Sequence, residues 1–249
     1  MIYYPIRVAK FAFFWLDWML LTAVLYLTSF LPKPWLDRFY PAFFRVWCKA
    51  FVRAIGVQLR LHQKNAKPLP KQFILIANHP SAFEDIGVPA LFNVYSLAKE
   101  EVRNWWIVGR ISWAAGTLYV QRESRESRRA AADQMVDELA KGKSIAVYPE
   151  GGCKGRRIFT SFRHGAFDIS MRTGIPIVPV FLHYEAQENF EWGSTHTLVE
   201  KVWHFMTAPN NHVNYYIFDA IEPGQFTSKE DYNQHVYNLY LQWQAKYLE

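Results

Sequence analysis

The chain has 249 residues, of which 51% are hydrophobic, 17% are aromatic and 20% are charged. This composition excludes a disordered or fibrous protein, and the length suits one α/β domain, alone or with a small appendage. The formal net charge is +6, and residues 1–60 account for all of it with eight basic and two acidic side chains. A basic, aromatic-rich segment beside a neutral body favours a membrane surface as partner, and no pattern in the body indicates nucleic-acid binding.

The first predicted element is an apolar helix from Phe11 to Leu31, in which Asp17 is the only charge. At about 1.5 Å per residue it is just long enough to cross a hydrocarbon core of about 30 Å. It is not a signal peptide, because the apolar run is too long and no small-residue cleavage site follows. Three interpretations stay open: an interfacial helix, which we favour, a transmembrane helix that bears Asp17, and a helix buried in a core.

A second apolar stretch at helical spacing runs from Trp35 to Ile55, with basic residues interleaved. The segment Pro32–Lys33–Pro34 joins it to the first helix. The pair predicts a hairpin that lies on or dips into one leaflet of a bilayer. Residues 1–55 are therefore expected to form a membrane-associating helical hairpin, and residues 56–249 an α/β domain.

After Gly56, apolar runs of strand length alternate with helical segments. This alternation predicts an α/β fold in which a mostly parallel sheet is flanked by helices. The two cysteines cannot build a disulfide framework, and no CxxC or HExxH spacing indicates a metal site, so no cofactor is expected. Strands are expected at 57–62, 73–77, 117–120, 144–148 and 177–182, and a further strand at the end of the segment 91–97. Helices are expected at 126–141, 166–173 and 229–248.

Two polar loops follow predicted strands, at the place where ligands bind in such sheets. The first contains His79, Ser81 and Glu84. A histidine at a strand end is by itself more often structural than catalytic, and Ser81-x-x-Glu84 is typical of a capping box that opens the next helix. A carboxylate there can also face the imidazole and stabilise its charged form while the other ring nitrogen takes a proton from a hydroxyl. Such a pair suits direct transfer to an acceptor alcohol.

Four blocks stand in order between residues 73 and 183: Asn78-His79-Pro80-Ser81-x-x-Glu84, Gly116–Arg122, Tyr148-Pro149-Glu150-Gly151 with Phe162–Phe167, and Ile175–Val180. They resemble, in this order, the four sequence blocks of the PlsC-like glycerolipid acyltransferases, the lysophosphatidic acid acyltransferase group. In that family the first block is NHxSxxD, the second ends in the arginine that binds the substrate phosphate, the third begins with FPEGTRS, and the fourth follows it. Ala98-Lys99-Glu100-Glu101 is similar to the family's K-x-E segment. No single block is specific, but the four in order are.

The resemblance implies transfer of a fatty acyl group from acyl-CoA or acyl carrier protein to the hydroxyl of a lysophospholipid, first of all 1-acylglycerol 3-phosphate. His79 would act as general base in an HX4E dyad, and Glu84 would orient it. A nearby amide or Lys99 would stabilise the oxyanion. The resemblance also implies a place at the cytoplasmic face of the bacterial inner membrane, with the acyl donor as co-substrate.

The same resemblance implies that Arg122 holds the acceptor's phosphate, with Glu150 and Gly151 shaping the loop. Arg122 is otherwise a surface cation in the mixed run 122–129, and Glu150 is otherwise a cap for the turn that follows it. For Glu150 the two interpretations have equal support.

Two departures from the family pattern affect the site. The orienting aspartate is replaced by Glu84, and Asp85 behind it is the alternative partner, although it stands about 100° further round a helix. The third block has EGGCK where the family has EGTRS, so Cys153 takes the arginine's place and Lys154 or Arg156 would supply the cation. We interpret Cys153 as a small filler without a reactive role.

Three other functions stay open. The acceptor would differ in an acyltransferase for a lyso-ornithine lipid, glycerol 3-phosphate or a glycolipid. The protein would be a catalytically silent lipid-binding module if the fold alone were kept, but the spacing of His79 and its carboxylate argues against this. A hydrolase is disfavoured because the sequence has no G-x-S-x-G elbow.

Overall fold

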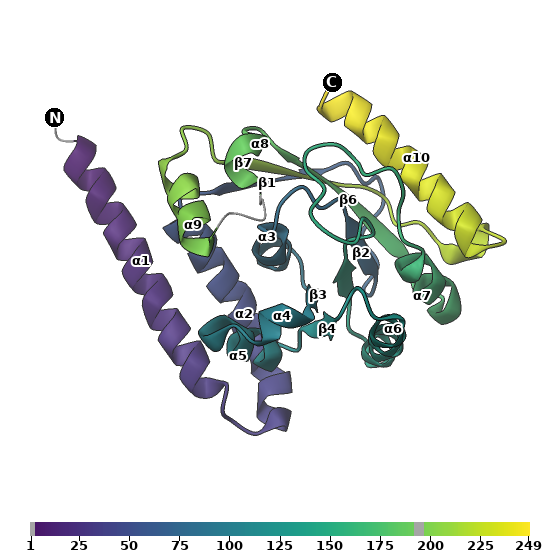
Figure 1. Ribbon diagram of the computed structural model, residues 1–249, viewed down its shortest axis with the longest axis horizontal. Coiled ribbons are helices and arrows are strands. Elements are labelled where there is room, and N and C mark those ends of the chain that lie inside the picture. Colours follow the sequence, from purple (N-terminus) through teal and green to yellow (C-terminus); the bar gives the residue numbers. More distant parts are fainter. Residues whose placement is uncertain (1–2, 192–196) are drawn as a thin grey trace.

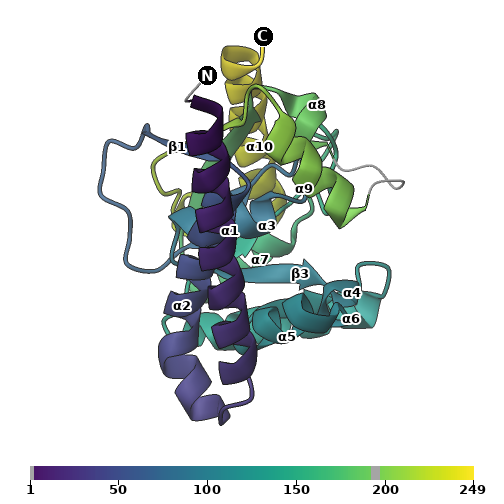
Figure 2. The same ribbon diagram turned by 90° about the vertical axis from the view of Figure 1, so that its left-hand side faces the viewer.

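The computed structural model describes residues 3–191 and 197–249. A seven-stranded sheet lies between two layers of helices, and a pair of N-terminal helices runs along one side (Figures 1 and 2). The strand order is β1-β7-β6-β2-β5-β3-β4. In chain order the strands are β1 (Gln58–Gln63), β2 (Ile74–Ala77), β3 (Tyr95–Lys99), β4 (Leu118–Val120), β5 (Ile145–Val147), β6 (Ile177–Tyr184) and β7 (His212–Ile217).

The described strand pairs are parallel except for β6 with β7, which confirms the prediction of a mostly parallel sheet. Its central strand, β2, is buried along its whole length, as expected where helices cover both faces. Because β2, β5, β3 and β4 run in one direction, the loops that follow them gather at one edge of the sheet. This edge carries His79, Glu150, Lys99 and Arg122.

Each face of the sheet has its own apolar core. One core joins the sheet to α1, α2, α3, α5, α8 and α9, and the other joins it to α6, α7 and α10. The side chains of β2 alternate between them, with Leu75 in the first core and Ile76 in the second. The helices are α1 (Tyr3–Thr28), α2 (Lys33–Ala54), α3 (Glu84–Leu91), α4 (Glu100–Arg103), α5 (Trp106–Ala114), α6 (Arg125–Ala140), α7 (Gly165–Thr173), α8 (Gln187–Phe190), α9 (Leu198–Thr207) and α10 (Lys229–Tyr247).

The predicted hairpin is present, although the first two residues of its range lie outside the described part of the chain. Helices α1 and α2 are antiparallel neighbours, and α1 lies on the outside (Figure 1). Two hydrogen bonds tie them together: the Tyr40 hydroxyl donates to the Leu25 carbonyl at 2.7 Å, and the Trp47 indole donates to the Thr22 hydroxyl at 2.7 Å. Aromatic rings fill the seam, with Trp18 against Trp47 at 5.8 Å between ring centroids.

The outward face of α1 is apolar and uncovered. Ala9–Thr28 is long and apolar enough to span a membrane, yet only 6% of its most apolar window is buried in the protein. The interpretation of this helix as a buried core helix is therefore wrong. The exposed side chains recur every three or four residues and so share one face. They are Phe13, Leu16, Met19, Leu20, Val24 and Leu27, and Phe30 in the turn after the helix is exposed as well.

Candidate active site

The loop after β2 and the loop after β5 are fastened together around His79. The Glu150 carboxylate accepts a hydrogen bond from the His79 backbone amide at 2.8 Å, and the Lys154 amide donates to the His79 carbonyl at 3.0 Å. The second oxygen of Glu150 accepts from the Phe159 amide at 3.0 Å. Both oxygens of this buried carboxylate thus hold backbone in place, and Glu150 shapes the loop.

Glu84 holds the imidazole of His79. One of its oxygens lies 3.0 Å from His79 Nδ1. The other accepts from the Ser81 amide at 3.0 Å and from the Tyr184 hydroxyl at 2.7 Å. Half of the predicted capping box is therefore present, because Glu84 accepts from the Ser81 amide, and the same carboxylate also faces the imidazole. The other half is not, because the Ser81 hydroxyl accepts from the Phe83 amide and Phe83 is the residue that precedes α3. With no exposed surface, Glu84 has all of its polar contacts within the protein.

Asp85 makes no comparable contact with His79 among the described residues. It stands in the first turn of α3 and lines a small cavity of about 60 Å³ together with residues of α2 and α5. Burial raises the pKa of Asp85, partly opposed by the positive charges of His79 and Arg122. Glu84, not Asp85, therefore makes the hydrogen bond to the imidazole.

The rest of the imidazole contacts Tyr148 and Cys153. The Tyr148 ring stacks on it with centroids 4.4 Å apart and planes 14° apart. His79 Nε2 lies 3.7 Å from the Cys153 sulfur, within hydrogen-bond distance for a thiol. Cys153 is exposed, so it does not fill a core space. The interpretation of Cys153 as a small filler is therefore corrected, because the loop fold brings its thiol to a histidine that is distant in sequence.

These contacts set the charge of the imidazole. Burial by itself would lower the pKa of His79, but hydrogen bonds with the Cys153 thiol and the Glu84 carboxylate outweigh burial and raise the pKa well above its usual value. The folded protein therefore favours the charged ring. The stabilisation that the charged ring of His79 gives the folded protein is fully present at a pH below the pKa of an unfolded histidine. It is lost as the pH rises through the higher pKa that His79 has in the folded protein.

We therefore expect the ring of His79, followed by NMR, to titrate above about pH 6.5, the usual value for histidine. The Glu84→Gln and Cys153→Ala variants should titrate at lower pH, since each removes one partner of the charged ring. A wild-type titration at or below the usual value, or one that neither variant changes, would contradict this assignment.

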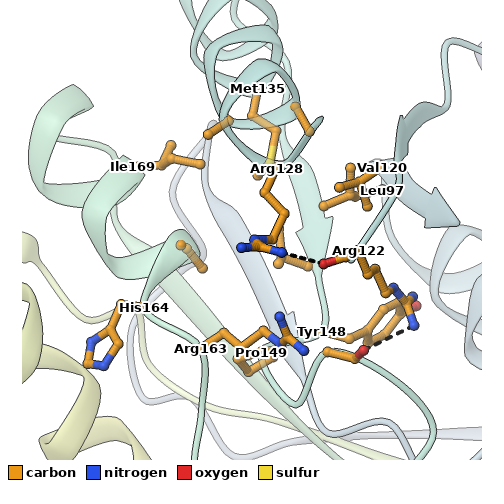
Figure 3. A pocket seen from close by; sticks show the side chains of 16 residues that line it. Leu97, Val120, Arg122, Arg128, Met135, Tyr148, Pro149, Arg163, His164 and Ile169 are labelled. Atoms are coloured by element: carbon orange, nitrogen blue, oxygen red, sulfur yellow. Dashed lines mark hydrogen bonds between the residues drawn. The ribbon is translucent and has the colours of Figure 1, made fainter. Parts of the chain in front are cut away.

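A pocket of about 430 Å³ opens beside Tyr148, on the side of the sheet that faces α6 and α7 (Figure 3). Its walls are mainly apolar, and three guanidinium groups lie along it. The described lining contains no acidic side chain. Such a pocket suits an amphipathic anion with an apolar chain. The lining is Leu97, Val120, Arg122, Arg128, Ala131, Ala132, Met135, Val147, Tyr148, Pro149, Gly151, Arg163, His164, Gly165, Ala166 and Ile169.

Arg122 and Gly151 meet at this pocket. Arg122 Nη1 donates to the Gly151 carbonyl at 3.1 Å, and the Arg122 carbonyl accepts from Arg128 at 2.6 Å (Figure 3). Gly151 has φ of +74°, and a Cβ there would lie 2.2 Å from Nε of Arg163. Only glycine allows this turn with an arginine packed on it.

Lys99 and Lys154 lie away from the pocket. The Lys99 ammonium pairs with Glu101 at 2.8 Å on the surface, and the Lys154 ammonium lies 4.3 Å from the centre of the Phe159 ring. Neither is part of the pocket lining. Their contacts with substrate stay predictions, and the backbone amide of Lys154 is the part that supports the site.

Sequence reasoning missed four side chains of the site. Tyr148 and Arg163 stand in blocks that the resemblance covers, so their blocks were the available signal. Arg128 stands in the mixed run of charges after Arg122, and such a run is equally typical of a solvent-exposed helix face. Tyr184 lies 100 residues from Glu84 in sequence, and no local pattern indicates that contact.

Comparison with known proteins supports the assignment of the fold and the family. Over 141 residues the chain is 27% identical to a lyso-ornithine lipid O-acyltransferase of Pseudomonas aeruginosa, covering 56% of this chain and 53% of that protein. Over 115 residues it is 24% identical to a 1-acyl-sn-glycerol-3-phosphate acyltransferase of Neisseria gonorrhoeae, covering 46% and 45% of the two chains. The chain thus spans about half the length of these relatives.

The crystal structure of the 1-acyl-sn-glycerophosphate acyltransferase PlsC from Thermotoga maritima has the same fold. The TM-score is 0.60 at 20% identity, over 94% of this chain and 93% of that one. The sequence profile of the Acyltransferase family matches residues 58–183, which include His79, Glu84, Arg122 and the loop at Glu150. The chain belongs to the Acyltransferase family.

Proposed function

We propose that this protein transfers a fatty acyl group from a thioester, acyl-CoA or acyl carrier protein, to the hydroxyl of a lysophospholipid. The observation that carries the proposal is the buried His79–Glu84 pair, whose imidazole stacks on Tyr148, a wall of an apolar pocket lined by three arginines. A general base at the edge of a pocket for an amphipathic anion suits this reaction.

His79 performs the proton transfers in this proposal. In the uncharged ring, which forms as the pH rises through the raised pKa of His79, Glu84 keeps the proton on Nδ1, so Nε2 can take a proton from a hydroxyl as its oxygen attacks the carbonyl of an acyl thioester. The thiol leaves with that proton. Glu84 then stabilises the charged ring during the transfer.

The acceptor is proposed from the charge of the pocket. Arg122, Arg128 and Arg163 present forked donors that suit a phosphate, which favours 1-acylglycerol 3-phosphate. A lyso-ornithine lipid is the second candidate, because a relative acts on that lipid by name. Purified protein incubated with acyl-CoA or acyl carrier protein and a panel of acceptors separates them by the lipid product formed.

Loss of Arg122 is expected to weaken binding of anionic acceptors. Arg122→Gln should raise KM for lysophosphatidate about tenfold or more, because a hydrogen bond to a charged group contributes about 1.5–3 kcal/mol. KM for an uncharged monoacylglycerol should change little. Arg129→Gln, on the same stretch but outside the pocket lining, is the matched control. Equal effects on charged and uncharged acceptors would show that Arg122 supports the loop only.

We also propose that α1 and α2 attach the protein to one leaflet, at the cytoplasmic face of the bacterial inner membrane, where acyl donors are available. The support is the uncovered apolar face of α1 and its packing on α2, which keeps the helix beside the domain. A lysophospholipid in that leaflet would then meet the site without leaving the membrane.

Two glutamates on the outward face should abolish this attachment. Leu20 and Leu27 are 60% and 70% exposed, so Leu20→Glu with Leu27→Glu should release the protein into the soluble fraction and leave its fold intact. Leu241→Glu, on the exposed side of α10, is the control. Sedimentation with vesicles measures the effect. Complete release of the wild type by high salt alone would instead indicate electrostatic attachment.

A further inference from the structure

The Cys153 thiol completes a chain of three groups that the proposed function uses only in part. The Glu84 carboxylate lies 3.0 Å from His79 Nδ1, and the Cys153 sulfur lies 3.7 Å from His79 Nε2. A nucleophile on one ring nitrogen and a carboxylate on the other is the arrangement that activates a side chain for covalent catalysis. The first two groups are buried and the thiol is exposed.

We propose that Cys153 is the first nucleophile of acyl transfer and carries the acyl group as a thioester before the acceptor receives it. This inference rests on the proposed function and adds a covalent intermediate to it. The thiol lies within hydrogen-bond distance of His79 Nε2. The side chain of His79 is only 4% exposed, and the exposed thiol lies beside its Nε2.

In the first step, the Cys153 thiol gives its proton to His79 Nε2, and its sulfur attacks the carbonyl of the donor thioester. The bond from that carbonyl to the donor sulfur breaks, and the donor leaves as a thiol with the proton from Nε2. In the second step, the acceptor hydroxyl gives its proton to Nε2 and its oxygen attacks the acyl group on Cys153. The Cys153 sulfur leaves and recovers the proton. The first step exchanges one thioester for another and the second converts it into the oxygen ester of the acceptor, so no oxidant, reductant or further reactant is required.

The position of the loop supports this assignment. The Lys154 amide donates to the His79 carbonyl at 3.0 Å, which fixes the residue after the thiol to the residue that bears the base. Arg122 Nη1 would lie 3.3 Å from a Cβ on Gly152, so a cation of the pocket stands beside the residue before the thiol. The hydrogen bond with Cys153 is also one of the causes that raise the pKa of His79.

Trapping of the intermediate tests the proposal. Full-length protein is incubated with acyl-CoA in the absence of acceptor, denatured, and measured by intact mass and peptide mapping. We expect one added acyl group on Cys153, released by neutral hydroxylamine and lost when lysophosphatidate is added. Cys153→Ala should carry no acyl group and should lose about 10²-fold or more in transfer rate. Initial rates against both substrates should give the parallel lines of a ping-pong reaction.

Two controls separate enzymatic acylation from chemical acylation. The buried Cys48→Ala variant should be acylated as the wild type is, and His79→Ala, which keeps the thiol but lacks the base, should not be acylated. Equal acylation of His79→Ala would mean that the thiol reacts with acyl-CoA without the site and would overturn the proposal.

The outcome for Cys153→Ala also keeps this inference distinct from the proposed function. Transfer by Cys153→Ala at the wild-type rate, with intersecting initial-rate lines, would overturn the covalent step and leave acyl transfer by His79 in place. Absence of thioester consumption by the wild type with every acceptor would instead refute the proposed function.

Discussion

Replacement of His79 by alanine is expected to abolish acyl transfer, with a loss of about 10²–10⁴ in rate. The imidazole is the described base whose two ring nitrogens contact a carboxylate and an exposed thiol. Both the hydroxyl and the thiol would lose their proton acceptor in the variant. The loss should therefore appear in kcat and kcat/KM together, since the proton transfer occurs only in the transition state.

The structural consequence of this change must be separated from the chemical one. His79 is buried and stacks on Tyr148, so alanine leaves a small cavity beside the ring. His79→Gln keeps more of the volume and should be equally inactive. His235→Ala, on the exposed side of α10, should be fully active. Melting temperature and vesicle binding of all three variants are measured alongside the rate. Activity of His79→Ala or His79→Gln within a few-fold of wild type would refute the mechanism.

The centre of the sheet could be predicted because its central strands, β2 and β6, are buried on both faces. The apolar run that forms β2 and the run that forms β6 have the length of strands and are bounded by turns, and both are central in the sheet. Helix α6 begins at its Ser124 cap and ends before Gly142, whose φ is +80°. Local signals therefore determined those bounds to within a residue or two.

The strand β7 could not be predicted in the same way. It has the sequence HVNYYI, in which Asn214 is buried and donates to Glu185 at 3.2 Å. A polar residue at a buried position breaks the apolar pattern, and the partner that satisfies it lies at the end of β6. The antiparallel pairing of β6 with β7 joins residues about 30 to 40 positions apart, which no local pattern indicates.

The contacts of the candidate site likewise divide into local contacts, which the sequence predicts, and long-range contacts, which it does not. His79 and Glu84 are five residues apart, so a helix start is sufficient to bring them together and sequence spacing predicts the pair. Cys153 and Tyr148 reach the imidazole from the neighbouring strand, 74 and 69 residues away, through the parallel pairing of β2 with β5. The departure from the family pattern at Cys153 was visible in the sequence, but its distance from His79 was not.

The exchange Glu84→Gln is expected to lower the rate nearly as far as His79→Ala does, whereas Asp85→Asn should have a mild effect. The amide oxygen of glutamine can still accept from the Ser81 amide and the Tyr184 hydroxyl, so two of the three bonds of Glu84 survive. Its NH2 group then faces His79 Nδ1, which must become an acceptor, and the ring proton moves to Nε2. An imidazole with the wrong tautomer cannot take a proton there, and the charged ring loses its stabilising carboxylate.

Rate and melting temperature together decide between the two carboxylates. If Glu84 orients the base, Glu84→Gln lowers the rate with little change in melting, because most of its structural bonds remain. If Glu84 served only as a helix cap, its loss would lower stability by about 0.5–2 kcal/mol and leave the rate near normal, and Asp85→Asn would then show the catalytic defect. The hydrogen bond from Glu84 to Nδ1 at 3.0 Å, in a site where that carboxylate is fully buried, makes the first outcome the expected one.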